Sequence, residues 1–131
     1  MQLYLDTSAL VKLVVDEHES SALESYVGEY SADRRFTAAL AHTELLRAIA
    51  RRQQADSIAH ARRLLGRLYV VPLTNRLLDR AATLTPLELR TLDAIHLAAA
   101  MTAPDLRAMV TYDARLAQAA INAGIAVVSP T

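Results

Sequence analysis

Short runs of apolar residues alternate along this chain with longer segments that place apolar residues at helical spacing. The short runs predict strands at residues 2–5, 35–37, 69–73, 108–111 and 125–128. The longer segments predict helices at residues 8–15, 19–30, 39–53, 55–68, 75–84, 91–101 and 114–123. Because strands and helices alternate throughout, the sequence predicts an α/β fold with a central, mostly parallel sheet of about five strands flanked by helices. No linker, repeat or low-complexity tract interrupts this order, so we expect one domain over residues 1–131.

Two of the predicted strands lead directly to an acid. Asp6 follows the strand at residues 2–5, and Asp113 follows the strand at residues 108–111. The carboxyl ends of parallel strands lie at the same edge of a sheet, and that edge is where open α/β sheets bind ligands. We therefore expect Asp6 and Asp113 to share one edge. Each also has a simpler interpretation, because either acid can cap the helix that follows it.

Two further acids lie in apolar stretches of predicted helices. Glu44 precedes two leucines, and Asp93 has apolar neighbours on both sides. A carboxylate on an apolar face is costly to bury unless it is paired or bound to a metal. Both helices can carry their acid to the sheet edge at which Asp6 lies. The alternatives are a solvated position for Glu44 and a capping role beside Thr91 for Asp93.

Four carboxylates brought to one place repel one another, so some of them would stay protonated at neutral pH. A divalent cation removes this conflict, and a site made only of carboxylate oxygens suits Mg²⁺ or Mn²⁺. Such a site, with one ion or two, can align a water molecule and a phosphodiester for in-line attack. The candidate catalytic and metal-binding residues are therefore Asp6, Glu44, Asp93 and Asp113.

Several polar side chains lie close to these acids in the sequence. The hydroxyls of Thr7, Ser8 and Thr111 can bind a metal-bound water; Thr7 and Ser8 are equally suited to cap the first helix, and Thr111 to be an ordinary strand residue. His96 lies one turn after Asp93, on the same helix face. Its chemistry allows it to ligate a metal, act as a base or contact RNA. Its apolar neighbours favour a buried histidine in the core or around the site.

The composition narrows the chemistry. The 131 residues are 53% hydrophobic and 21% charged, which is typical of a folded domain with an apolar core. The absence of cysteine excludes disulfides, thiolate metal sites and a cysteine nucleophile. No targeting segment precedes the first strand, and no apolar stretch reaches the ~20 residues of a membrane span. We therefore expect a soluble, cytoplasmic protein.

The net charge is zero, but the charges are unevenly distributed. Residues 13–33 contain six acids and no base, whereas residues 45–68 contain six arginines and one acid, so the local sums are −6 and +5. Arginine side chains suit phosphate oxygens, which makes the basic stretch between Arg47 and Arg67 a candidate nucleic-acid surface. A solvated helix face, or a surface that meets an acidic protein partner, explains the same pattern.

Two other functions fit parts of the pattern. An aspartate after the first strand also serves as a phosphate acceptor, but haloacid-dehalogenase-like phosphatases have a second aspartate two residues later, where this chain has Ser8. Those phosphatases and receiver domains also need a lysine late in the chain, and Lys12 is the only lysine. A non-catalytic protein-binding module is the second alternative, and the four acids argue against it.

Four short blocks carry the candidate residues: residues 5–10 (LDTSAL), 43–48 (TELLRA), 92–98 (LDAIHLA) and 110–116 (VTYDARL). Together they resemble the blocks of PIN-domain ribonucleases, and most closely those of the VapC toxins of bacterial toxin–antitoxin systems. They occur in the family's order and at ordinary spacings over almost the whole chain. One such block alone is a weak signal, whereas four together are specific.

The resemblance implies a PIN-like three-layer fold and cleavage of RNA that depends on Mg²⁺ or Mn²⁺. It assigns the acidic quartet to the four acids named above, with Asp6 and Asp93 as the most direct metal ligands. Thr7 and Thr111 match positions that often line the site. The resemblance also implies a homodimer that is inhibited by a VapB-type antitoxin, whose tail lies over the acids and often places an arginine among them. Residues 69–90 carry no signature of the family.

Overall fold

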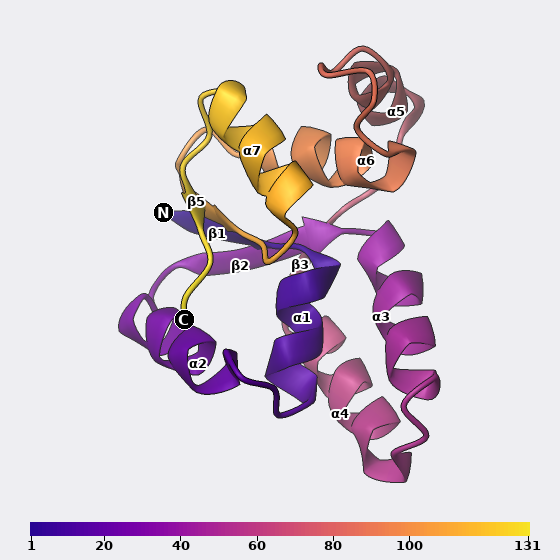
Figure 1. Ribbon diagram of the computed structural model, residues 1–131, viewed down its shortest axis with the longest axis vertical. Helices are drawn as coiled ribbons and strands as arrows, with labels where there is room; N and C mark the ends of the chain where they lie inside the picture. Colours follow the sequence, from indigo (N-terminus) through magenta and orange to yellow (C-terminus); the bar gives the residue numbers. More distant parts are fainter.

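A single five-stranded parallel sheet runs through the computed structural model, which describes residues 1–131 (Figure 1). The strand order is β3-β2-β1-β4-β5, and every neighbouring pair is parallel. The strands are β1 (Gln2–Leu5), β2 (Arg34–Ala38), β3 (Tyr69–Val71), β4 (Leu106–Val110) and β5 (Val127–Val128). The predicted α/β class with a five-stranded parallel sheet is confirmed.

Seven helices cover the two faces of this sheet. They are α1 (Thr7–Val14), α2 (Ser20–Glu29), α3 (Leu40–Ala50), α4 (Ala55–Gly66), α5 (Asn75–Ala82), α6 (Thr91–Ala100) and α7 (Ala114–Asn122). Helices α1 to α4 lie on one face and α5 to α7 on the other, which gives three layers (Figure 1). None of the seven helices is both long and apolar enough to cross a membrane.

The central strand β1 is buried on both faces. Leu3 and Leu5 point into the core beneath α1 to α4, whereas Tyr4 between them packs on the opposite side with Phe36 and Met109. This alternation follows from the two-residue period of a strand. Because both faces are covered, the strand is almost entirely apolar, as parallel strands commonly are. Its one acid, Asp6, comes at the point where the strand ends.

The order of the strands creates a topological switch point at the carboxyl ends of β1 and β4. From β1 the chain proceeds outward to β2 and β3, and it then returns to the other side of β1 to form β4 and β5. The direction of winding therefore reverses between β1 and β4. At such a switch point the helices after the two strands leave on opposite faces, and open α/β sheets generally bind ligands at the carboxyl ends of the strands there. We call this edge of the sheet the crevice.

Several element boundaries differ from the sequence prediction, and three of these differences have a clear physical reason. The strand predicted at residues 108–111 begins earlier, at Leu106, because the start of β4 pairs with β1. The strand predicted at residues 69–73 ends at Val71, because Pro72 has no backbone N–H to continue the ladder. The first helix begins at Thr7, one residue early, because Asp6 rather than Thr7 or Ser8 caps it.

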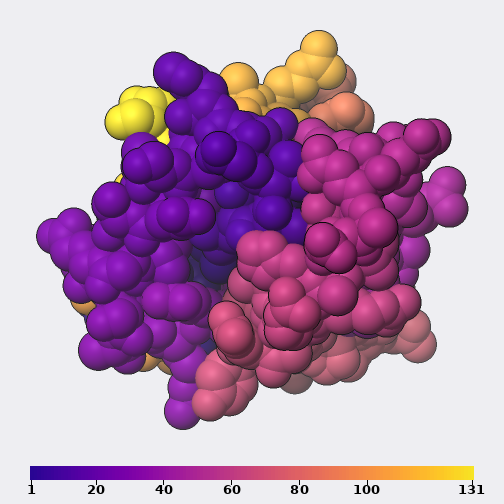
Figure 2. Space-filling model, turned by 90° about the horizontal axis from the view of Figure 1, so that it is seen from below, coloured from indigo at the N-terminus to yellow at the C-terminus, as the bar shows by residue number.

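The acidic and basic stretches of the sequence meet on one face of the molecule. Arg52, just after α3, lies 3.1 Å from Glu17, and Lys12 on α1 lies 2.7 Å from Glu19. Figure 2 shows this side, where the indigo and purple α1–α2 segment adjoins the magenta α3–α4 segment. Five other arginines of the basic stretch are exposed and form no ion pair: Arg47, Arg51, Arg62, Arg63 and Arg67. The basic stretch is therefore only partly neutralised within the chain.

A buried ion pair fastens the opposite edge of the sheet, at the amino ends of the strands. Asp33, whose side chain is 6% exposed, accepts two hydrogen bonds from Arg107 on β4 and lies 3.3 Å from the amino group of Met1. The guanidinium also stacks 4.0 Å from the ring centroid of Tyr30. The Arg107 hydrogen bonds hold the pKa of Asp33 below its ordinary value. This cluster joins the end of α2 to β1 and β4.

Replacing Asp33 should therefore destabilise the fold in a pH-dependent way. Because the pKa of Asp33 lies below 3.8, its stabilising contribution is complete above that pH and is lost as the pH falls through the folded-state value. We expect Asp33→Asn to lower the free energy of unfolding in urea at neutral pH, and the deficit to shrink below about pH 3.8. Asp79→Asn, at an exposed position on α5, is the control. A deficit that stays constant down to about pH 2.5 would contradict this assignment.

Candidate active site

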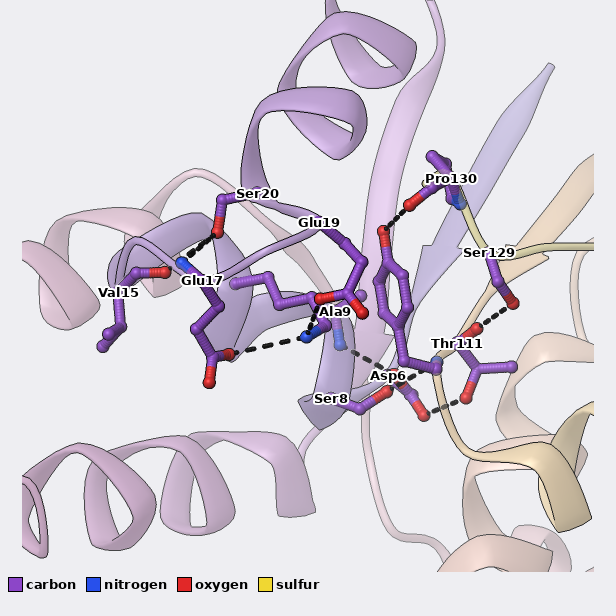
Figure 3. Close-up of polar contacts among 12 residues, drawn as sticks. Asp6, Ser8, Ala9, Val15, Glu17, Glu19, Ser20, Thr111, Ser129 and Pro130 are labelled. Atoms are coloured by element: carbon purple, nitrogen blue, oxygen red, sulfur yellow. Dashed lines mark hydrogen bonds and ion pairs between the residues drawn. The ribbon is translucent and has the colours of Figure 1, made fainter.

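Asp6 is the central residue of the crevice. It follows β1 directly and caps α1, since its Oδ1 accepts hydrogen bonds from the backbone N–H of Ala9 (3.0 Å) and the hydroxyl of Ser8 (2.6 Å). Its Oδ2 accepts a hydrogen bond of 2.6 Å from the Thr111 hydroxyl, across the gap from β1 to β4 (Figure 3). Only 3% of the residue is exposed. The expectation that Thr7 or Ser8 would cap the helix is wrong, because Asp6 itself does so.

The loop after β4 is held to Asp6 by two hydroxyls. The Ser8 hydroxyl accepts a hydrogen bond from the backbone N–H of Tyr112 (2.9 Å), and the Thr111 hydroxyl accepts one from that of Asp113 (3.1 Å). Both hydroxyls also donate to the Asp6 carboxylate. Burial raises the pKa of Asp6 above its ordinary value, although the bonds from Ser8 and Thr111 oppose the shift. The two hydroxyls thus join both strand ends of the switch point.

Glu44 reaches the crevice from α3 and is not a solvated residue. Its Oε1 accepts hydrogen bonds from the Thr7 hydroxyl (2.6 Å) and from His96 Nε2 (2.7 Å). Burial pushes its pKa upward, but the bonds from His96 and Thr7 outweigh this effect, so the pKa lies below its ordinary value. Both bonds go to Oε1, so Oε2 forms no hydrogen bond within the chain.

His96 is buried beneath Glu44, as its apolar neighbours in the sequence indicated. It is 2% exposed, and both ring nitrogens are engaged, because Nδ1 lies 2.6 Å from the Tyr4 hydroxyl. The Tyr4 hydroxyl oxygen accepts a hydrogen bond from the backbone N–H of Ala38 (3.2 Å), so the hydroxyl proton of Tyr4 can be donated to His96 Nδ1. His96 then carries its own proton on Nε2 and donates it to Glu44. Burial raises the pKa of Tyr4 far above its ordinary value, so the hydroxyl keeps its proton.

Asp113 and Asp93 lie on the other side of the crevice and share one arginine. Asp113 caps α7 through Oδ1, which accepts the N–H groups of Arg115 (2.9 Å) and Leu116 (3.0 Å). Its Oδ2 accepts a bond of 2.9 Å from Arg90 Nη2, while Asp93 Oδ2, at the start of α6, accepts one of 3.0 Å from Arg90 Nε. Asp113 therefore has both of the roles that the sequence left open: it caps α7, and it lies at the sheet edge with the other acids.

Two residues of this network were missed by the sequence analysis. Tyr4 reads as an ordinary strand residue, and the only signal was that a buried tyrosine hydroxyl needs a hydrogen-bond partner. Arg90 lies in residues 87–90, which have no clear pattern, and the only signal was its position three residues before Asp93. Residues 69–90 carry no signature of the family, yet Arg90 binds two of the four acids.

Three of the four acids are connected at one sheet edge, whereas Glu44 is held separately by Thr7 and His96, and the four do not form a complete set of metal ligands. Asp6 connects through Thr111 to Asp113, which connects through Arg90 to Asp93. No three His, Asp or Glu side chains lie close enough together to hold one ion in this arrangement. The donor atoms nevertheless fit a hard divalent cation, since carboxylate and hydroxyl oxygens surround the crevice and a positive group already binds two of the carboxylates.

The chain belongs to the PIN-domain family, because the family's pattern matches residues 3–122. Among characterised proteins, it is 44% identical to Ribonuclease VapC46 of Mycobacterium tuberculosis over 130 residues, which cover 98% of each chain. It is 40% identical to Ribonuclease VapC47 of the same species over 131 residues, covering 98% of this chain and 96% of that one. The resemblance of the four sequence blocks to PIN-domain proteins is confirmed.

Solved structures show the same fold at lower sequence identity. The sarcin–ricin-loop-cleaving toxin VapC20 of Mycobacterium tuberculosis superimposes with a TM-score of 0.74 at 17% identity, covering 98% of this chain and 100% of that one. A chain of a toxin–antitoxin complex from Klebsiella pneumoniae gives a TM-score of 0.71 at 22% identity, covering 100% of this chain and 98% of that one. The three-layer PIN-like architecture is therefore confirmed.

Removal of the Thr111 hydroxyl tests how the crevice is held together. Thr111→Val leaves Asp6 Oδ2 buried without its donor, which should cost about 1–3 kcal/mol in the free energy of unfolding at neutral pH. Thr111→Ser keeps the hydroxyl and should recover most of that loss. Urea unfolding of the two variants beside the parent chain measures both effects. A Thr111→Val variant as stable as the parent chain would contradict the role assigned to the hydroxyl.

Proposed function

We propose that this protein is the toxin of a type II toxin–antitoxin system and acts as a VapC-type ribonuclease that hydrolyses RNA phosphodiester bonds with Mg²⁺ or Mn²⁺. The observation that carries the proposal is the group of Asp6, Glu44, Asp93 and Asp113 at the switch-point crevice. The chain in which this group lies is 44% identical to a protein named Ribonuclease VapC46 over nearly its whole length. Fold likeness alone would not support an activity.

In the proposed mechanism the four acids hold the divalent cation, which when bound activates water and offsets charge on the phosphate. The chain's own residues prepare this site. Thr7 and His96 fix the orientation of Glu44, and Thr111 fixes that of Asp6. The Thr7 and Thr111 hydroxyls also lie beside carboxylates, where they can bind water of the cation's shell. His96 is not the base in this mechanism, because both of its ring nitrogens are already engaged.

The proposal includes three partners. The RNA substrate meets the crevice at the carboxyl ends of the strands, and a VapB-type antitoxin covers that crevice and blocks it. A structural relative was solved as a toxin–antitoxin complex, which supports the antitoxin as a partner. A second copy of the chain completes a homodimer, as the family resemblance implies. An enzyme that acts on cellular RNA in this way works in the cytoplasm.

The proposed activity is tested with purified protein and a structured RNA substrate. The parent chain should cleave RNA only when Mg²⁺ or Mn²⁺ is present, and EDTA should stop cleavage. Asp6→Asn and Asp93→Asn should each lower the cleavage rate by on the order of 100-fold or more, because each removes a charged ligand from the proposed metal site.

Asp79→Asn is the matched control, since it makes the same chemical change at an exposed position outside the crevice. It should cleave RNA at the parental rate. Folded parent protein that cuts no RNA at any metal concentration would favour the non-catalytic binding module instead. Cleavage that survives both Asp6→Asn and Asp93→Asn would show that the four-acid site is not the catalytic one.

The proposed antitoxin is tested through the product of a small gene directly upstream, where one is present. Co-expressed with this chain, that product should co-purify with it and reduce RNA cleavage to background. Limited proteolysis of the complex should release the activity, because the protease cuts an exposed antitoxin tail more readily than the folded enzyme. A complex that cleaves RNA at the rate of the free chain would contradict the proposed neutralisation.

A further inference from the structure

Arg90 is the only basic side chain that binds the acids of the crevice directly, apart from the imidazole of His96 on Glu44. It is the residue before α6, and its guanidinium spans two elements: Nε reaches Asp93 on α6 and Nη2 reaches Asp113 before α7. These two acids lie 20 residues apart in the sequence. The arginine therefore bridges two elements that no other side-chain bond joins at this point.

The oxygens that Arg90 occupies are those a metal ion would need. Asp113 uses Oδ1 to cap α7, so Oδ2 is its remaining oxygen, and Arg90 holds that atom. Asp93 also gives its Oδ2 to Arg90. A divalent cation placed between the two carboxylates would lie where the guanidinium now lies, and the two positive groups would repel each other. Arginine and cation therefore compete for this pair of carboxylates.

The side chain of Arg90 is free to leave. It is 64% exposed, whereas the Asp93 and Asp113 side chains are 16% and 25% exposed. Arg90 caps nothing through its side chain, and these two acids are its only hydrogen-bond partners. Its release therefore breaks two charge-assisted bonds and exposes no apolar core.

We propose that Arg90 is an internal competitor of the divalent cation: it bridges Asp93 and Asp113, and a cation that binds between these two acids displaces it. This inference rests on the proposed metal-dependent function. In the metal-free protein the guanidinium supplies one positive charge that keeps the two acids from repelling each other. A divalent cation supplies twice that charge to the same oxygens and replaces it. The affinity for metal is thus set partly by the strength of the arginine bridge.

The planar guanidinium group explains why an arginine suits position 90 better than a lysine. Two different nitrogens of one guanidinium reach the two acids, whereas the single ammonium of lysine cannot reproduce this fork. Arg90→Lys should consequently compete less well than arginine, and Arg90→Gln should not compete at all. If competition falls in the order arginine, lysine, glutamine, the two-nitrogen bridge is responsible and not positive charge in general.

The test measures Mn²⁺ binding to the full chain, by electron paramagnetic resonance of the free ion, so that no RNA or turnover is needed. Arg90→Gln should bind Mn²⁺ about tenfold more tightly than the parent chain, and Arg90→Lys should fall between them; exposed ion pairs are weak, which limits the gain. Arg115→Gln removes the same charge from an exposed side chain near Asp113 that makes no ion pair. It should change the affinity by less than about twofold.

Thermal melting gives an independent readout. Without metal, Arg90→Gln should melt at a lower temperature than the parent, because the two acids then lack their counter-charge. Saturating Mn²⁺ should raise its melting temperature by more than it raises that of the parent, since binding no longer displaces a bridge. An unchanged Mn²⁺ affinity in Arg90→Gln would overturn the proposal, and a weaker one would show that Arg90 prepares the acids for metal instead.

Failure of this inference is distinguishable from failure of the proposed function. If the parent binds Mn²⁺, loses it on Asp93→Asn and cleaves RNA with metal, but Arg90→Gln binds Mn²⁺ equally well, only the competition is wrong. If neither the parent nor Arg90→Gln binds Mn²⁺, both the competition and the metal-dependent site are wrong.

Discussion

Burial of the Asp6 carboxylate is the constraint on which the rest of the structure depends. A charge that is only 3% exposed is tolerated because three donors satisfy it, namely the Ser8 hydroxyl, the Ala9 N–H and the Thr111 hydroxyl. These donors come from the start of α1 and from the end of β4. The same bonds that stabilise the charge therefore fix the two strand ends of the switch point against each other, and through Thr111 they also position Asp113.

The four acids are compensated in two physically different ways. Asp6 and Glu44 accept hydrogen bonds from hydroxyls, a backbone N–H and a buried histidine, all held by packed elements. Asp93 and Asp113 are compensated by Arg90, a flexible and mostly exposed side chain. The first kind of compensation is permanent because its donors cannot leave without disturbing the fold. The second is exchangeable, so the crevice has a rigid half on β1, α1 and α3 and an adaptable half on α6 and α7.

The sequence predicts the parts of this site that depend on local pattern. The strand endings at Asp6 and Asp113 were readable because an apolar run stops at an acid, and the alternation of elements placed both at one edge. The position of Glu44 was not decidable from helical spacing, because the same spacing fits a solvated face. Tyr4 and His96 meet across 92 residues, and no local pattern announces such a contact. Arg90 was missed because its partners become neighbours only when α6 and α7 pack.

The side chains of the crevice differ in how far they are exposed to solvent, and this difference indicates the side from which a ligand approaches. Asp6 and His96 are closed off by the sheet, and Glu44 is 27% exposed. Arg90, by contrast, is 64% exposed, so its guanidinium is accessible to an incoming ion or phosphate. A cation that approaches from solvent therefore reaches Asp93 and Asp113 before it reaches Asp6. In the proposed mechanism, opening of the Arg90 bridge at the exposed rim would therefore come before binding at the buried Asp6 carboxylate, which its three donors already orient.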